Sequence, residues 1–289
     1  MTTHLLIDAN ALCHRAKHAM DTVNLSTHEI KTEVIFGFIM GLPMLSKALN
    51  SGNFIFVWDS PRYLRNNIYP GYKDKPTEVK SDSEKELDAL TYPQFDMLRE
   101  TIIPDMGFNN NFWQKGMEAD DVIAAITINN PDKEFIIVSR DNDLYQLLNG
   151  KVVMYDPILK KLNTDLSFEA KHGIPPQRWW EAKAIAGCST DSLPGVPGVG
   201  EPTAIKYMLG TLPPKYKTYK SIMDNEDIIE RNKLLVKLPF EGTDIPNLVP
   251  DELVMGRFIG VFEDFDFQSQ LRDDAFDRWM GIIERYDNE

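Results

Sequence analysis

Short apolar runs recur along the first half of the chain, and most of them end at turn residues. They are rich in β-branched and aromatic side chains and cover Leu5–Asp8, Phe54–Asp59, Phe135–Ser139 and Lys151–Asp156. Their hydrophobicity is continuous rather than alternating, which is typical of strands buried on both faces of a parallel sheet. Amphipathic stretches of helical character occur at Glu33–Leu49, Pro93–Ile103 and Glu118–Ile128. This order predicts an α/β domain in which right-handed crossovers join the strands of a mostly parallel sheet.

The pattern changes near residue 175, where strand-like runs give way to helices punctuated by Gly and Pro. We therefore divide the chain into residues 1–175 and a second, helical region at 176–289. Within the first part, the polar stretch at about 60–92 is long enough to be a functional loop or an inserted helical element. The acidic C-terminal segment, residues 251–289, has 11 acidic and 4 basic residues and is expected to be a solvated face.

Composition and charge narrow the class of protein. Hydrophobic residues make up 43% and charged residues 26%, which excludes a disordered, collagen-like or coiled-coil chain. The two cysteines, Cys13 and Cys188, exclude a disulfide framework and indicate a reducing, cytoplasmic compartment. No apolar run approaches the ~20 residues that a membrane span needs, so no membrane partner is expected. The net charge of −13 repels nucleic acid unless basic patches or metal ions intervene.

Acidic residues follow the predicted strands at the same edge of the sheet. Asp8 and Asp59 end the first two strands, and Asp141 and Asp143 follow the third. The first turn of the helix predicted at Glu118–Ile128 adds Glu118, Asp120 and Asp121. Each carboxylate alone is more simply a turn or cap residue. Together they repel one another and raise one another's pKa values, which costs stability unless cations neutralise them. Oxygen ligands favour Mg²⁺ or Mn²⁺, and two such ions suit phosphodiester hydrolysis.

Two further segments combine features that bind phosphate. The turn GVPGVG, residues 195–200, precedes a helix, and its backbone N–H groups are suited to an anion; the alternative is a structural turn between helices. The following residues 203–220 include Lys206 among four lysines and no acid. Residues 60–75 interleave Arg62, Arg65, Lys73 and Lys75 with tyrosines. This is the composition of a platform for single-stranded DNA, although a solvated loop anchored by its tyrosines is the alternative.

A series of motifs occurs in an order that is specific even though no single motif is. They are LLIDANALCHRAKHA, FVWDSPRYLRNNIYPGYK, EADDVIAAI, FIIVSRDNDLYQLL and GCSTDSLPGVPGVGEPTAIKYM, with a weaker echo at RNKLLVKLPF. On these motifs, over roughly residues 4–240, the chain resembles the 5′-nuclease family. This family comprises phage 5′–3′ exonucleases, flap endonucleases and the 5′-nuclease domain of bacterial DNA polymerase I. Because no polymerase domain accompanies the motifs, we expect a free-standing phage-type enzyme.

The resemblance implies a PIN-like nuclease fold with a helical arch at about 60–92, and a helix-three-turn-helix at about 180–210. It implies cleavage of 5′ flaps and duplex 5′ ends by two Mg²⁺ ions, with Mn²⁺ as a substitute, and a K⁺ ion at the glycine turn. The implied catalytic residues are Lys73, which contacts the scissile phosphate, Asp8 and Asp59. The implied metal ligands are Asp8, Asp59, Glu118, Asp120, Asp121, Asp141, Asp143 and Asp191. The residues expected to bind DNA are Arg15, His18, Arg62, Arg65, Tyr72, Lys73, Lys75, Gly198, Gly200 and Lys206.

The chain departs from the family pattern at Cys188. Bacterial and phage members usually show Gly-Asp-x-x-Asp-Asn before the glycine turn, whereas this chain has Gly-Cys-Ser-Thr-Asp-Ser at residues 187–192. A thiol is a soft ligand and is poorly suited to Mg²⁺. The second metal ion is therefore expected to bind more weakly or to be Mn²⁺.

The resulting hypothesis is a structure-specific 5′ nuclease that removes flaps or RNA primers during phage DNA replication. Two other readings stay open: a DNA-junction-binding protein with impaired catalysis, and a PIN-type RNA nuclease. The expected partners are DNA with 5′ flaps or duplex 5′ ends, RNA–DNA primers, and a replication polymerase or single-strand-binding protein. We expect a monomer in the cytoplasm of the host cell.

Overall fold

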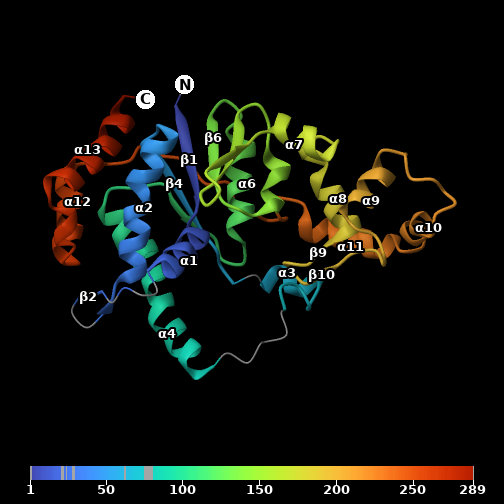
Figure 1. The fold of residues 1–289 in the computed structure, drawn as a ribbon, viewed down its shortest axis with the longest axis horizontal. Coiled ribbons are helices and arrows are strands. Elements are labelled where there is room, and N and C mark those ends of the chain that lie inside the picture. The colour runs from blue at the N-terminus through green and yellow to red at the C-terminus, as the bar shows by residue number, and fades with distance from the viewer. Residues whose placement is uncertain are drawn as a thin grey trace.

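The computed structural model describes residues 2–20, 23, 25–27, 30–61, 63–74 and 81–288. At its centre is a six-stranded sheet with the strands in the order β5-β4-β1-β6-β7-β8 (Figure 1). The strands are β1 (Thr3–Asp8), β4 (Asn53–Trp58), β5 (Asn111–Trp113), β6 (Glu134–Val138), β7 (Val152–Asp156) and β8 (Lys161–Asn163). β8 pairs antiparallel with β7, and the other pairings are parallel. The prediction of an α/β fold with a mostly parallel sheet is confirmed, and the four predicted strands are β1, β4, β6 and β7.

The two faces of the sheet carry separate hydrophobic clusters, because successive side chains of a strand point to opposite faces. Leu5 and Ile7 of β1 and Phe56 of β4 belong to one cluster. Leu6 of β1 and Val57 of β4 belong to the other. Each of these side chains is fully buried. The continuous hydrophobicity of the predicted strands therefore reflects burial on both faces.

Helices cover both faces of the sheet (Figure 1). The first face packs against α1 (Ala9–Ala19), α2 (Glu33–Leu49), α4 (Asp82–Met97), a π-helical turn (Leu98–Ile102) and α5 (Ile103–Asp105). The second packs against α6 (Ala119–Asn129) and α7 (Asp165–His172). The helix predicted at Pro93–Ile103 is longer than expected, because Ser81 and Glu84 form a capping box that starts α4 early. No helix in the described ranges is long and apolar enough to cross a membrane.

The predicted arch, at about residues 60–92, contains α3 (Tyr63–Ile68) and the first part of α4. Between α1 and α2, β2 (Ser26–Thr27) and β3 (Ile30–Lys31) pair antiparallel in a separate two-stranded sheet. Lys17 of α1 forms an ion pair with Asp88 of α4, with Nζ 2.7 Å from Oδ1, and this contact ties α4 to α1. Arg62 and Lys75 lie outside the described residues, so their assignment to DNA binding stays a prediction.

Residues 176–236, called the helical arm below, extend away from one end of the sheet (Figure 1). The arm contains a 3-10 turn (Pro176–Arg178), α8 (Trp179–Ala186), β9 (Gly187–Cys188), β10 (Leu193–Pro194), α9 (Glu201–Met208), α10 (Lys217–Asp224) and α11 (Glu226–Val236). Trp179 and Ile205 of the arm belong to the same buried cluster as Leu6 of the sheet. α8 and α9 flank residues 187–200, where the helix-three-turn-helix is predicted; the motif and its DNA binding stay predictions.

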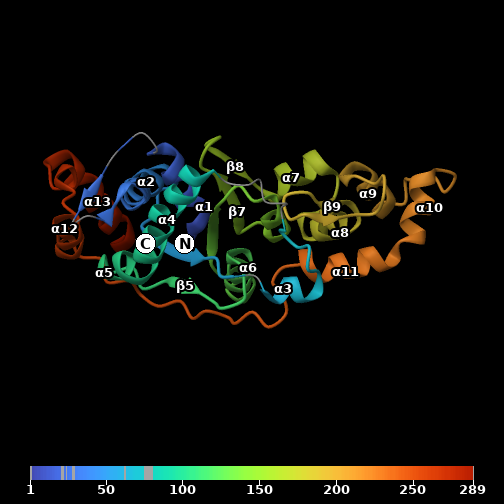
Figure 2. The ribbon, with the colours of Figure 1, turned by 90° about the horizontal axis from the view of Figure 1, so that it is seen from below.

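After the arm, an extended segment at residues 241–254 runs back along the sheet (Figure 2). Asn110, next to the edge strand β5, holds this segment by donating to Val249 O and accepting from Val249 N. The chain then forms α12 (Met255–Asp264), a 3-10 turn (Gln268–Gln270) and α13 (Asp273–Asp287). Phe258 and Trp279 of these helices are fully buried in the cluster of the first face. Residues 176–289 therefore do not pack as one unit, and the division of the chain into domains stays a prediction.

The returning segment carries a carboxylate that should make stability depend on pH. Asp251 Oδ1 accepts hydrogen bonds from Asn109 N (2.7 Å) and Asn110 Nδ2 (3.2 Å). Burial raises the pKa of Asp251 to about 6. A carboxyl whose pKa is higher in the folded than in the unfolded protein stabilises the fold at low pH, and this contribution is lost as the pH rises through about 6.

We therefore expect Asp251→Asn to stabilise the protein by about 1–3 kcal/mol at pH 8 and to have little effect at pH 4. Asparagine keeps the Oδ1 acceptor and removes the charge. Urea unfolding at both pH values measures the difference, and Asp132→Asn, at an exposed turn position, serves as the control. An equal loss of stability at both pH values would show that the charge of Asp251 is not the cause.

Candidate active site

The carboxyl ends of β1 and β4 place two predicted aspartates beside each other. Asp8 ends β1 and caps α1, because its Oδ1 accepts a hydrogen bond from Ala11 N at 3.0 Å. Asp59 follows β4, is exposed, and accepts from Ala119 N at 2.8 Å through Oδ1. Asn10 of α1 accepts from the backbone N of Asp59 at 2.9 Å. The starts of α1 and α6 are thus fastened to the strand ends that carry these carboxylates.

Ser139 joins the end of β6 to the same edge. Its hydroxyl donates to Asp8 Oδ2 at 2.9 Å and accepts from Asp141 N at 3.1 Å. Asp141 in turn accepts from Asp143 N at 2.8 Å and so starts the 3-10 helix Asn142–Leu147. Sequence reasoning treated Ser139 as the last residue of a strand and missed this bridge. Its position directly before the SRDND motif was the available signal.

The carboxylates at this edge destabilise one another's charge. Burial and the neighbouring Asp59 raise the pKa of Asp8 to about 7. Partial desolvation and the neighbouring Asp141 and Asp8 raise the pKa of Asp120 well above its usual value. Desolvation and Asp143 also raise the pKa of Asp141. A cation placed among these groups would relieve the repulsion, and their oxygen-only donors fit a hard divalent ion.

Lys73 lies between two carboxylates on the side of the site nearest the arch. Its Nζ is 2.6 Å from Glu118 Oε1 and 3.5 Å from Asp191 Oδ1. Its backbone has a φ of 50° and donates to Asp191 O at 2.6 Å. A left-handed conformation is unfavourable for lysine, so the surrounding contacts must hold it. Burial opposes the charge, but Tyr72 and Glu118 outweigh it and raise the pKa of Lys73 above its usual value.

The structure corrects the role expected of Tyr72. Tyr72 was expected to bind DNA, but its side chain is only 4% exposed. Its hydroxyl donates to Glu118 Oε2 at 2.9 Å. Tyr72 therefore positions Glu118 and has no ring face available to a nucleobase in this structure.

The structure also corrects the roles of Arg65 and Asp121. Arg65 was expected to bind DNA, but it is 2% exposed and its guanidinium donates to both Asp121 oxygens, at 2.5 and 2.7 Å. Asp121 was expected to bind metal, but it is fully buried and also accepts from Glu118 N and Phe240 N. These four hydrogen bonds use the acceptor sites of the carboxylate. The pair therefore joins α3 to α6 in the interior and has no group free for DNA or a cation.

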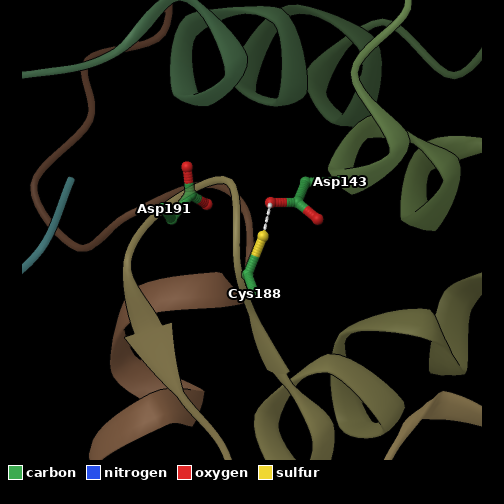
Figure 3. A group of neighbouring side chains, drawn as sticks. All are labelled: Asp143, Cys188 and Asp191. Atoms are coloured by element: carbon green, nitrogen blue, oxygen red, sulfur yellow. Dashed lines mark hydrogen bonds between the residues drawn. The ribbon is translucent and has the colours of Figure 1, made fainter. Parts of the chain in front are cut away.

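Asp143, Cys188 and Asp191 bring one ligand atom each within 4.8 Å of one another, the only such group among the described parts of the chain. Figure 3 shows the three side chains pointing toward a common space. Cys188 Sγ lies 2.9 Å from Thr190 Oγ1 and 3.8 Å from Asp143 Oδ2. Burial and the nearby Asp143 raise the pKa of the Cys188 thiol to about 11.

Lys183 was missed by the sequence analysis. It lies on α8 with its Nζ 3.2 Å from Asp143 Oδ1 and 3.4 Å from Glu201 Oε1. The signal was a single lysine in the mostly apolar run WWEAKAIA.

A cleft of about 630 Å³ lies between the sheet edge and the arm, and its lining includes Asp8, Ser139, Asp141, Asp143, Lys183, Cys188, Thr190 and Glu201.

The glycine turn needs glycine at positions that the sequence analysis did not single out. A Cβ on Gly187 would lie 2.3 Å from Gly195 N, and one on Gly195 would lie 2.1 Å from Ala186 C. The backbones of β9 and β10 can therefore approach only because both residues lack a side chain. Of the residues predicted here, Gly198 has a φ of 76° and Gly200 is the N-cap of α9.

The remaining residues predicted to bind DNA lie on helix surfaces. His18 of α1 and Lys206 of α9 are exposed, and Arg15 of α1 is half-buried. Their contact with DNA stays a prediction.

The mostly parallel sheet carries carboxylates and two lysines at the edge where open α/β sheets bind their ligands. Residues 3–173 match the family described as "5'-3' exonuclease, N-terminal resolvase-like domain". The chain therefore belongs to the 5′–3′ exonuclease family.

Relatives and solved structures agree with this assignment. The chain is 30% identical over 266 residues to DNA polymerase I of Deinococcus radiodurans, which covers 84% of this chain and 26% of the polymerase. It therefore spans about a quarter of the length of that relative. It is 26% identical to the 5′-3′ exonuclease of Buchnera aphidicola, with 82% of this chain and 77% of that protein covered.

Two structures of the T5 D15 protein share the fold. The protein co-crystallised with metal ions has a TM-score of 0.71 at 19% identity, covering 98% of this chain and 99% of that one. The bacteriophage T5 D15 flap endonuclease in a pseudo-enzyme-product complex with DNA and metal ions has a TM-score of 0.69 at 19% identity, with 99% of both chains covered.

Proposed function

We propose that this protein is a structure-specific 5′ nuclease that hydrolyses DNA phosphodiester bonds with divalent cations. The observation that carries the proposal is the row of carboxylates at the sheet edge, formed by Asp8, Asp59, Asp120 and Asp141. Their raised pKa values at Asp8, Asp120 and Asp141 fit a site that needs cations. Membership of the 5′–3′ exonuclease family and the DNA and metal ions named for the T5 D15 complex support the same function.

The residues have separate roles in the proposed reaction. Bound Mg²⁺ ions would activate water and neutralise the charge of the leaving oxygen. Asp8, Asp59, Asp120 and Asp141 would hold the ions, while Ser139 and Asn10 fix the carboxylates of Asp8 and the backbone of Asp59. The ammonium of Lys73 is held beside the site by Glu118 and Asp191 and would stabilise the charge that develops on the scissile phosphate.

The proposed substrates are DNA 5′ flaps and duplex 5′ ends. Exposed His18 and Lys206 and the half-buried Arg15 are suited to contact the phosphate backbone. A K⁺ ion at the turn carrying Gly198 and Gly200 belongs to the same proposal. So do primer removal in phage DNA replication, action as a cytoplasmic monomer, and work beside a polymerase or single-strand-binding protein.

The direct test compares cleavage of a 5′-labelled flap duplex in Mg²⁺, in Mn²⁺ and in EDTA. We expect a short labelled product with either metal and none in EDTA, because without a cation the carboxylates would repel the phosphate and nothing would neutralise the charge of the leaving oxygen. A matched duplex with an RNA flap of the same sequence gives the substrate preference.

The other outcomes favour the rival functions. Tight binding of the flap duplex without cleavage in any of these conditions would favour a DNA-junction-binding protein. Faster cleavage of the RNA flap than of the DNA flap would favour an RNA nuclease.

A further inference from the structure

The donor atoms near the carboxyl edge of the sheet are of two kinds. Around Asp8, Asp59, Asp120 and Asp141 they are carboxylate oxygens, whereas the group formed by Asp143, Cys188 and Asp191 includes a sulfur. Mg²⁺ binds oxygen ligands and does not favour thiolate, while Zn²⁺ and other thiophilic ions bind both. The oxygen-only donors fit a hard ion, and the mixed group does not.

The geometry of the mixed group suits a small tetrahedral ion. Zn–S bonds are about 2.3 Å and Zn–O bonds about 2.1 Å, so sulfur and oxygen ligands of one tetrahedral ion lie roughly 3.6 Å apart. Cys188 Sγ and Asp143 Oδ2 are 3.8 Å apart. Asp191 supplies the third ligand atom within 4.8 Å of the others, and its side chain is 9% exposed. A modest side-chain movement would bring the three donors onto one ion.

The cations now beside these carboxylates have other partners. Lys183, which pairs with Asp143, also lies 3.4 Å from Glu201 Oε1. Lys73, which is 3.5 Å from Asp191, makes its closer ion pair of 2.6 Å with Glu118. Both carboxylates can therefore turn to an ion without leaving a lysine unpaired. Asp143 Oδ1 is buried, and its partner is Lys183, whose Nζ lies 3.2 Å away in an ion pair.

We infer that Asp143, Cys188 and Asp191 form a site selective for a thiophilic divalent cation of the Zn²⁺ class, separate from the oxygen-only donors at the same edge of the sheet. The inference deepens the proposed function, because it assigns different ion preferences to two parts of one nuclease site. The inference rests on the proposed function only for the role that the bound cation would have in the protein, because cation binding itself is measured without DNA.

The test is Cd²⁺ titration of the full chain, followed by the sulfur-to-cadmium charge-transfer absorption in the ultraviolet. We expect the absorption to saturate at one Cd²⁺ per chain in the wild type and to be lost in Cys188→Ser. Cys13→Ser is the matched control, because Cys13 is the other cysteine and is fully buried in α1. Zn²⁺ should displace Cd²⁺ at a concentration roughly 100-fold or more below that needed for Mg²⁺.

Several results would overturn the inference. They are no charge-transfer absorption in the wild type, its survival in Cys188→Ser, or its loss in Cys13→Ser. Displacement by Mg²⁺ as readily as by Zn²⁺ would overturn the selectivity. Asp191→Asn provides a second variant, and unchanged Cd²⁺ affinity in it would exclude the three-residue site. Flap cleavage with a failed Cd²⁺ titration would leave the proposed function standing, whereas the Cd²⁺ signal without cleavage would leave the site standing alone.

Discussion

Replacing Asp59 with asparagine should lower metal-dependent cleavage of a flap duplex by about 10³-fold or more. Metal ions contribute several kcal/mol of transition-state stabilisation, and each 1.36 kcal/mol is a factor of ten in rate. Asn keeps the Oδ1 that accepts from Ala119 N at 2.8 Å, so the start of α6 should be unaffected. The loss should therefore come from the charge and not from the fold. Single-turnover cleavage in Mg²⁺ measures it.

Asp132→Asn is the matched control for this variant. Asp132 is exposed and precedes β6, at the opposite end of that strand from Asp141, so its charge is remote from the cleft. It should cleave at the wild-type rate. Asp59→Asn cleavage within about tenfold of the wild type would remove Asp59 from the proposed metal ligands.

Replacing Arg65 with methionine should destabilise the protein by about 3–5 kcal/mol, because removing one partner of a buried ion pair leaves the other charge uncompensated. Asp121 is fully buried and would keep only the hydrogen bonds from Glu118 N and Phe240 N. The lost bond from Arg65 Nε to Leu235 O would also weaken the contact between α3 and α11. Urea unfolding at pH 7 measures the change.

Two comparisons make this result specific. Arg178 and Glu181 form a partly exposed pair on the surface, so Arg178→Met should change stability by less than about 1 kcal/mol. Combining Arg65→Met with Asp121→Asn should recover part of the lost stability, since asparagine leaves no unpaired charge and keeps one oxygen that can accept from the backbone N of Glu118 or Phe240. A double variant no more stable than Arg65→Met would show that packing, and not the unpaired charge, causes the loss.

The sequence was sufficient to predict four of the six strands of the sheet and the edge where the carboxylates lie, but not the short strands β5 and β8. Buried parallel strands have continuous apolar runs. The aspartates at the ends of these runs can be placed at one edge of the sheet without any knowledge of side-chain contacts. The same reasoning predicted α2 with its bounds and the change to helices near residue 175. Its success rests on hydrophobic periodicity and on turn residues, which are local properties of the chain.

Side-chain partners were predicted less well, because they depend on contacts between distant residues. Arg65 reads as a basic residue in a polar loop, and only the fold shows Asp121 opposite it, 56 residues away. Ser139 bridges Asp8 across 131 residues. The packing of Trp279 on the sheet face was not predicted, because the sequence around it is rich in acidic residues. In the structure the acidic residues point outward, and the apolar stripe that includes Trp279 is buried.

The returning segment at residues 241–254 makes the sheet body discontinuous in sequence. The chain leaves this body after α7, builds the helical arm, and comes back to complete the layer formed by α12 and α13. The arm is thus an insertion tethered by two crossings, which leaves it fewer rigid-body motions than a terminal domain on one linker. Since the arm carries Cys188 and Thr190 and the body carries Asp8 and Asp143, this double attachment limits how far the two walls of the cleft can move apart.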